Sequence, residues 1–408
     1  MTPASRPPKP PKARRPGARP RPGRPSRPRA DTRPPAPARP PARLYARTCP
    51  GLEEALSHEL SQTIRPNHIE TAKGFVTFEW PSPQPTAKRL LACDSLCLLV
   101  RHAVGDLAGR RGLTELRGKL ARTTFDHHLP RLPEFGLARP ETIRVRASVA
   151  RPCAFAFFDV VREATPIVER RLGLPASEAA GALVVEVECS ATDLYVGFGL
   201  PLIDWVDPRR RALPRSLVGA LVRLAGPGPH LAACDPDCGA GEVLRAWRLV
   251  APRGKALGLS MGRRRGESDA TVPPGVVASP RSWPIAGGRL SRIISALPRI
   301  ADPGQLAHLL DETARCLAVG GRAVLATALL GASRAAVESQ PRLRLERSLR
   351  VHVAEGHLDV IVLTREPDAR PHRTPTTAGD RARATKGLGG AVSAPRPRRA
   401  RRGHHDSK

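Results

Sequence analysis

One stretch of the sequence constrains the fold more than any other, and it reads HLAACDPDCGAG over residues 230–241. Its apolar start predicts a short buried strand, and its end is rich in glycine, which takes tight backbone turns that other residues avoid. The letters that follow predict a helix in EVLRAWRLV (242–250) and a second strand in KALGLS (255–260). A strand, a glycine-rich loop, a helix and a strand in this order are typical of a parallel α/β sheet.

The two cysteines of this stretch allow a second interpretation. Cys234 and Cys238 could form a thiol or metal site instead of flanking a cofactor loop. The 8 cysteines of the chain are scattered and include no CxxC pair, so neither zinc spacing nor a disulfide framework is supported. We therefore expect reduced, mostly buried thiols and no metal.

The alternation of strands and helices continues to residue 365 and predicts a doubly wound α/β domain over 205–365. Leu306, Leu309 and Leu310 keep the helical period within one of these helices. The pieces are helices in LPRSLVGALVRLA (213–225) and GQLAHLLDETARCL (304–317), strands in RLSRIISALP (289–298) and GRAVLAT (321–327), and a final pair of strands over 343–365 that meet at Gly356.

The residues before this domain predict two separate α+β units, over 43–138 and 139–204. The first unit begins with a strand in LYARTC and a helix with Leu52, Ala55, Leu56 and Leu60 on one face. A strand in KGFVTFEW (73–80) follows, and then a helix in AKRLLACDSLCLLV (87–100) with Cys93 and Cys97 in the core. The unit ends in an irregular polar segment over 106–138. The second comprises a strand in TIRVRASV (142–149) with Arg144 and Arg146 on its polar face, a helix over 158–174, and a β-hairpin in ALVVEVECSATDLYVGFGL (182–200).

The charge of the chain is concentrated at its ends. The formal net charge is +30; residues 1–42 hold 12 Lys or Arg against one acid, with 15 prolines, and residues 365–408 hold 12 against four acids. We expect disordered tails over 1–42 and 366–408 that attract polyanions such as RNA. A compositional bias towards Arg, Pro and Ala without a specific role is the alternative.

No apolar run reaches the ~18 residues of a membrane span and the start lacks a signal-peptide segment, so we expect a cytoplasmic protein without membrane contact.

Taken in order, these pieces resemble the THUMP-domain RNA methyltransferases, which modify the exocyclic amine of guanine in tRNA or rRNA. The resemblance covers about residues 43–365. CDPDCGAGEVL matches the pattern D-P-x-C-G-x-G of that family, SDATVPP (268–274) looks like its G-D-A-x-x-L-P stretch, and SALPRI (295–300) stands where it carries N-L-P-F-G or N-P-P-Y. PGLEEALSHEL with KGFVTFE looks like its ferredoxin-like segment, and ETIRVRASV through LYVGFGL looks like the THUMP module.

The resemblance implies a seven-stranded, Rossmann-like methyltransferase domain that binds S-adenosyl-methionine and structured RNA. It implies roles for the following residues: Asp235, Pro236, Gly239 and Gly241 at the methionine part of the cofactor, Ser260 at the ribose, and Asp269 at the adenine. The candidates for RNA contacts are Arg144 and Arg146 on the polar face of their strand, and the basic cluster Arg263, Arg264 and Arg265, for which a solvated loop is the alternative.

Three positions depart from the family pattern. The second strand ends in Ser260 where the family has an acid, and Glu242 replaces a threonine after the loop. The motif that orients the target amine is replaced by Ala296, Leu297, Pro298 and Arg299, without the asparagine and the aromatic residue. Two alternatives follow: an RNA methyltransferase whose orienting acceptor differs from that of the family, or an inactive RNA-binding protein on the same fold.

Overall fold

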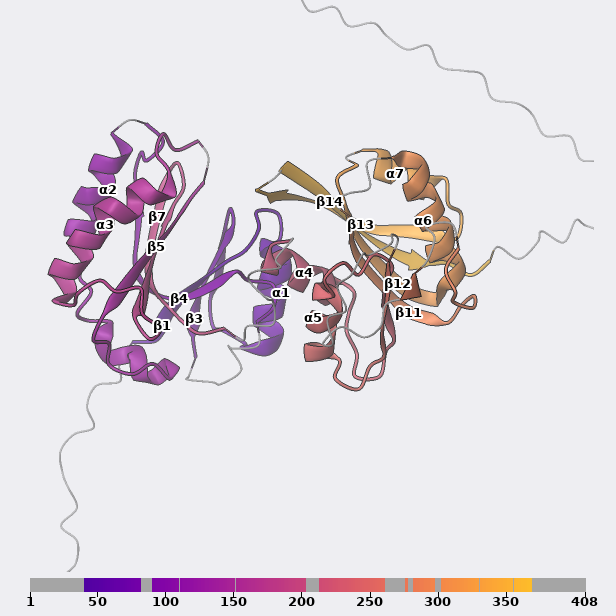
Figure 1. The fold of residues 1–408 in the computed structure, drawn as a ribbon, viewed down its shortest axis with the longest axis horizontal. Helices are drawn as coiled ribbons and strands as arrows, with labels where there is room; N and C mark the ends of the chain where they lie inside the picture. Colours follow the sequence, from indigo (N-terminus) through magenta and orange to yellow (C-terminus); the bar gives the residue numbers. More distant parts are fainter. Residues whose placement is uncertain are drawn as a thin grey trace, which may run out of the picture. The chain divides into compact units, whose positions relative to one another are not determined.

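The described part of the chain contains two seven-stranded sheets (Figure 1). In the computed structural model, the described residues are 40–81, 90–109, 111–150, 152–202, 213–260, 276–277, 282–297, 302–329, 331–354 and 356–368. The predicted tails fall almost entirely outside these ranges. No helix among the described residues is long and apolar enough to cross a bilayer.

The first sheet joins the strands of both predicted α+β units. Its strands are β1 (Ala42–Arg47), β2 (Ile69–Ala72), β3 (Phe75–Trp80), β4 (Ser95–Val104), β5 (Ile143–Val149), β6 (Leu183–Cys189) and β7 (Asp193–Gly199), in the order β2-β3-β1-β4-β7-β6-β5. Because β4 pairs with both β1 and β7, the two predicted units are not separate at the level of the sheet. The hairpin predicted over 182–200 is confirmed as β6 and β7.

Helices cover one face of this sheet and bury its alternating apolar residues. They are α1 (Glu53–Thr63), α2 (Gly112–Ala121), the short 3-10 helix η2 (Leu129–Phe135) and α3 (Phe157–Leu172). Val160, Ala164 and Val168 of α3 lie in the same buried cluster as Ile143 and Val145 of β5. The sequence predicted α1 and α3, but it missed α2 and η2 in the segment expected to be irregular.

The helix predicted over 87–100 is wrong. Residues 90–94 have no helical structure, and the strand β4 begins at Ser95. Both Cys93 and Cys97 are fully buried, as expected, although they do not share a helix face. The physical reason is that β4 lies at the centre of the sheet and is apolar on both faces, which removes the alternation that distinguishes a strand from a helix.

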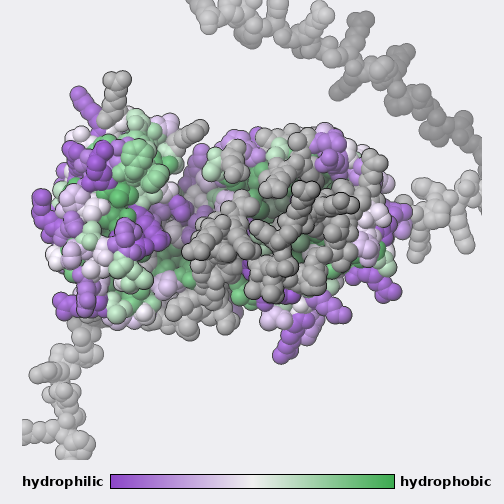
Figure 2. All heavy atoms as spheres, viewed as in Figure 1, coloured by the Kyte–Doolittle hydropathy of each residue, from purple (hydrophilic) through white to green (hydrophobic). Residues whose placement is uncertain are grey.

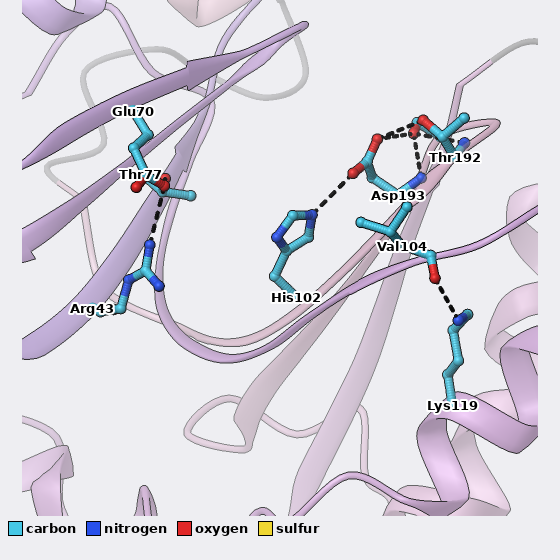
Figure 3. Close-up of polar contacts among 9 residues, drawn as sticks. Arg43, Glu70, Thr77, His102, Val104, Lys119, Thr192 and Asp193 are labelled. Carbon is cyan, nitrogen blue, oxygen red and sulfur yellow. Dashed lines mark hydrogen bonds and ion pairs between the residues drawn. The ribbon is translucent and has the colours of Figure 1, made fainter.

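The opposite face, which none of the described helices covers, carries rings and ion pairs. Tyr45 and Tyr195 are buried there, and Gly197 leaves room for them, since a Cβ on it would lie 2.6 Å from the ring of Tyr45. The imidazole of His102 stacks on Tyr195 with centroids 4.3 Å apart. Its Nε2 lies 2.9 Å from Oδ1 of Asp193 (Figure 3). These contacts fix the central strands on the face opposite the described helices.

The second sheet confirms the predicted seven-stranded, doubly wound α/β fold. Its strands are β8 (Ala233–Asp235), β9 (Ala256–Ser260), β10 (Val276–Val277), β11 (Leu290–Leu297), β12 (Leu317–Thr327), β13 (Leu343–Val353) and β14 (Gly356–Arg365), in the order β10-β9-β8-β11-β12-β14-β13. The first five are parallel, and β14 runs antiparallel to β12 and β13. Helices α4 (Arg215–Leu224) and α5 (Glu242–Val250) belong to one buried cluster, while α6 (Pro303–Cys316) and the unpredicted α7 (Ala332–Glu338) contribute to the other.

Helix α4 is held against α1 by a buried charge. The carboxylate of Glu59 is fully buried, accepts hydrogen bonds from the backbone N–H groups of Leu91 and Ala92, and lies 2.6 Å from the guanidinium of Arg223. Gly219 of α4 approaches the carbonyl oxygen of Leu91 so closely that a Cβ on it would lie 2.2 Å away. The glycine and the ion pair therefore determine how closely α4 packs.

Candidate cofactor site

The predicted loop follows β8, the strand at which the order of the second sheet reverses. β8 pairs with β9 on one side and with β11 on the other, and all three strands are parallel. In open α/β sheets, ligands bind at the carboxyl ends of the strands beside this reversal, where the two neighbouring loops diverge. The stretch singled out in the sequence thus stands where such a sheet binds its ligand.

The loop requires both of its glycines. Gly239 has a φ of +48° and Gly241 a φ of +79°, in the left-handed region that residues with a Cβ rarely adopt. The N–H of Gly241 donates to the carbonyl of Cys238 over 2.6 Å, and the N–H of Cys238 donates to the carbonyl of Leu259 over 2.9 Å. Gly241 is also the residue from which α5 starts. The backbone therefore turns sharply from β8 into α5.

The cysteines of the loop act as packing residues. Cys234 is fully buried, and burial raises the pKa of its thiol well above the ordinary value. Cys238 is 7% exposed, and its Sγ lies 2.9 Å from where a Cβ on Gly258 would stand. Within the described ranges, no group of three or more His, Cys, Asp or Glu could hold a metal ion. The two thiols are therefore buried packing residues, as expected from the sequence.

Asp235 is a buried carboxylate at the end of β8. It is 2% exposed, and its Oδ1 accepts hydrogen bonds from the hydroxyl of Ser295 over 2.7 Å and from the N–H of Asp237 over 3.2 Å. Burial raises the pKa of this carboxyl to about 7, and no cationic side chain of the described residues contributes to lowering it. A cation supplied by a ligand would thus find a counter-charge here.

Ser295 is the site residue that sequence reasoning missed. It lies in β11 and is fully buried, directly before the motif that departs from the family pattern. The only sequence signal for Ser295 was that a polar residue stands near the end of an otherwise apolar strand.

The last two residues of β11, Ala296 and Leu297, carry no side-chain acceptor. Ala296 is 8% exposed and Leu297, the last residue of the strand, is fully buried. The neighbouring strand ends in Thr327, which is buried and accepts a hydrogen bond from the N–H of Leu329 over 3.2 Å. The other half of the predicted motif, Pro298 and Arg299, lies outside the described residues.

The remaining predicted residues separate into three groups. Pro236 is buried in the loop, and Ser260 ends β9 at the same edge of the sheet as Asp235. Asp269 and the cluster Arg263, Arg264 and Arg265 lie outside the described residues. Arg144 and Arg146 belong to the first sheet and are not part of this site.

The two arginines of β5 differ in their availability. Arg144 donates hydrogen bonds to the carbonyls of Glu178 and Ala179 and lies 3.1 Å from the carboxylate of Glu178, so its guanidinium is engaged within the protein. The side chain of Arg146 is 56% exposed and lies 3.9 Å from that of Glu186. Of the two, Arg146 has the more exposed side chain, at 56% against 22% for Arg144.

The fold is shared with solved structures, while comparisons by sequence are negative: no family model and no curated protein matches the chain. The structure of TrmN from Thermus thermophilus is 21% identical and superposes with a TM-score of 0.58, covering 79% of this chain and 99% of TrmN. A possible methylase from Clostridium difficile 630 is 12% identical with a TM-score of 0.54, covering 81% and 99%. A predicted N6-adenine-specific DNA methylase from Listeria monocytogenes is 11% identical with a TM-score of 0.50, covering 80% and 96%. The chain has the fold of these proteins over almost their whole length.

Proposed function

We propose that this chain is an S-adenosyl-methionine-dependent RNA methyltransferase that acts on the exocyclic amine of guanine in tRNA or rRNA. The observation that carries the proposal is the buried Asp235 beside two left-handed glycines, at the reversal of strand order. The ordered motifs of the sequence and a fold shared with TrmN support it.

The residues of the loop fit the proposed cofactor. S-adenosyl-methionine carries an ammonium group, and the carboxylate of Asp235 has no cationic partner among the described residues that would compete for it. Asp235 would hold that ammonium, and Gly239 and Gly241 would admit the methionine part against the backbone. By resemblance, Ser260 and Asp269 would contact the ribose and the adenine. When bound, the cofactor supplies an electrophilic methyl group.

The residues of β11 would then orient the target amine. Ala296 has no acceptor in its side chain, so the backbone carbonyl of Leu297 is the group left to accept a hydrogen bond from the amine. Arg299 would stack on the base or contact a phosphate instead of enclosing the base as an aromatic residue would.

A second function is favoured by Ala296 itself. Loss of an orienting acceptor costs a few powers of ten in rate by the usual contribution of positioning groups. An inactive RNA-binding protein that retains the cofactor loop would tolerate this loss. The two functions differ in turnover and not in fold.

Two measurements separate the possibilities. Titration calorimetry of the full chain with S-adenosyl-methionine should give saturable binding that Asp235→Asn weakens. Incubation with unmodified tRNA or rRNA and methyl-labelled cofactor should then give labelled guanine. Binding without labelled RNA would support the inactive alternative, and absence of binding at millimolar cofactor would overturn the methyltransferase proposal.

A further inference from the structure

Two arginines stand beside each other on neighbouring parallel strands of the second sheet. Arg292 of β11 and Arg322 of β12 are register partners. Their side chains lie on the face of the sheet that packs against α4, because Ile294 and Val324, two positions further along the same strands, belong to the buried cluster that contains this helix. Like charges placed opposite each other on a sheet are unfavourable, so the pair calls for a compensating anion.

Both guanidinium groups approach one open point beside Gly226, just after α4. A Cβ on Gly226 would stand 3.4 Å from Nη1 of Arg322 and 3.9 Å from Nη2 of Arg292. Outside the neighbours of the glycine in the chain, no other atom of the described residues lies within 4 Å of that point. The missing side chain therefore leaves a space in which a small anion would meet N–H groups of both arginines.

The carboxylates nearby do not compensate both charges. Arg322 lies 3.0 Å from the carboxylate of Glu346, which also lies 3.8 Å from the guanidinium of Arg344. Arg292 has no acidic side-chain partner among the described residues, and its Nε and Nη1 donate to backbone carbonyls. Burial and the charge of Arg322 lower the pKa of the Arg292 guanidinium. The Nη2 group of Arg292 thus has donors that the described part of the chain leaves unused.

The edge of the sheet near this pair carries further cations. The segments 225–232, 251–255 and 282–289 lead into β8, β9 and β11, which are parallel neighbours, so these segments meet at the edge opposite the cofactor loop. They contain no Asp or Glu, and their basic residues are His230, Arg253, Lys255 and Arg289. Hydrophilic side chains project from the borders of the part that holds the second sheet, at the right of the space-filling view (Figure 2). Cations without acids at one edge raise the local concentration of anions.

We infer that the space beside Gly226 binds a phosphate group, held between the guanidinium groups of Arg292 and Arg322. The planar fork of a guanidinium matches the oxygens of a phosphate, and two such groups balance both negative charges of a phosphate monoester or of inorganic phosphate. The site is separate from the proposed cofactor site, because Arg292 lies three positions before Ser295 and on the opposite face of β11. A free phosphate compound and a backbone phosphate of RNA share this chemistry.

The first test measures thermal unfolding of the full chain over a series of inorganic phosphate concentrations, with chloride keeping the ionic strength constant. A ligand that binds only the folded chain raises its unfolding temperature. Arg292→Gln should weaken phosphate binding by about 10- to 150-fold, the usual contribution of hydrogen bonds to a charged group, and should lose most of the rise. Arg170→Gln is the matched control, because Arg170 is exposed on α3 in the first sheet and has no acidic side-chain partner among the described residues.

Two outcomes of this test would overturn the inference. An equal rise in all three proteins would be the general stabilisation that phosphate gives to folded proteins. If Arg292→Gln unfolds at a lower temperature than the parent by the same amount with and without phosphate, the arginine has only a structural role.

Substitution of Gly226 supplies the anion from within the chain. Gly226 has a φ of +67°, which Asp and Asn adopt more readily than other residues with a Cβ, so Gly226→Asp and Gly226→Asn have a similar backbone cost. The carboxylate of Gly226→Asp would lie between the two guanidinium groups. In chloride this variant should therefore unfold at a higher temperature than Gly226→Asn, and phosphate should no longer raise that temperature. Equal temperatures in chloride would mean that no uncompensated positive charge faces this space, which contradicts the inference.

The same pair of variants identifies the source of the phosphate. The affinity of each full chain for unmodified tRNA is measured by anisotropy over a range of salt concentrations. A lower affinity of Gly226→Asp than of Gly226→Asn, at low salt above all, assigns the site to a backbone phosphate of RNA. Equal affinities, together with the lost response to inorganic phosphate, assign it to a free phosphate compound. All variants should bind S-adenosyl-methionine like the parent in calorimetry, so the result does not depend on the proposed function.

Discussion

At the scale of single residues, the ionised form of Asp235 should lower the free energy of unfolding, although it is the form that would bind the ammonium of the cofactor. The folded chain holds its proton more tightly than the unfolded chain does, because burial raises the folded pKa to about 7. Stability is therefore lost as pH rises from about 4 to about 7, by at most about 4 kcal/mol. Asp235→Asn keeps an acceptor for Ser295 and removes this loss, so it should unfold several degrees higher than the parent at pH 8 and at nearly the same temperature at pH 4. If Asp235→Asn and the parent unfold at the same temperature at pH 8, the pKa of Asp235 is not raised by burial.

The same carboxyl should make cofactor binding depend on pH. A ligand ammonium requires the ionised form of Asp235, which is lost below pH about 7. Affinity for S-adenosyl-methionine should thus be about tenfold weaker at pH 6 than at pH 8. Titration calorimetry at the two pH values measures this, and in Asp235→Asn the dependence should vanish. An equal dependence in the variant would assign the titration to another group.

Residue-level prediction succeeded where the backbone itself demands a residue type. Gly239 and Gly241 were predictable because a sharp turn between a strand and a helix needs left-handed residues. Ser295 was not, since its partner Asp235 is 60 positions away and only the parallel pairing of β8 and β11 brings them together. The carbonyls of Glu178 and Ala179 that engage Arg144 were likewise not predictable, since they lie in the loop between α3 and β6, more than 30 positions away.

At the scale of elements, apolar patterns predicted strands and helices except where an element is buried on both sides. Leu96 and Leu98 of β4 face the helices, while Cys97 and Leu99 belong to the cluster on the other face. The resulting continuous apolar run has no period of two and resembled a helix. Helix α2 was missed for a different reason: it contains Gly112 and Gly118, and glycine has a low helix propensity.

The contact of α4 can be tested through its glycine. Gly219→Ala places a Cβ 2.2 Å from the carbonyl oxygen of Leu91, and neither backbone can move freely. We expect a loss of about 1–3 kcal/mol in the free energy of unfolding, measured by chemical denaturation. Gly118→Ala is the control, because a Cβ there meets only the flexible end of Arg122, at 3.7 Å. That change should stabilise the protein by about 0.5–1 kcal/mol, so a destabilised control would indicate that helix propensity does not dominate at this position.

At the scale of the whole molecule, two different physical contributions to RNA affinity are expected from different parts of the chain. The ends carry most of the unbalanced charge, with 12 Lys or Arg against one acid in residues 1–42 and 12 against four in residues 365–408. The residues between them, 43–364, carry a net charge of +11. Charge released as counterions gives affinity that falls steeply with salt, whereas stacking does not.

Removing the ends should therefore change the kind of binding as well as its strength. A chain of residues 40–368 should bind single-stranded RNA more weakly at low salt and with a much shallower salt dependence than the full chain, because most counterion release is lost. At high salt the two chains should converge, since the residual affinity comes from the folded part. Anisotropy titrations of both chains over the same salt series make the comparison. If the plots of log affinity against log salt concentration have the same slope for both chains, the tails contribute no phosphate contacts. The salt dependence would then come from charged residues of the folded part.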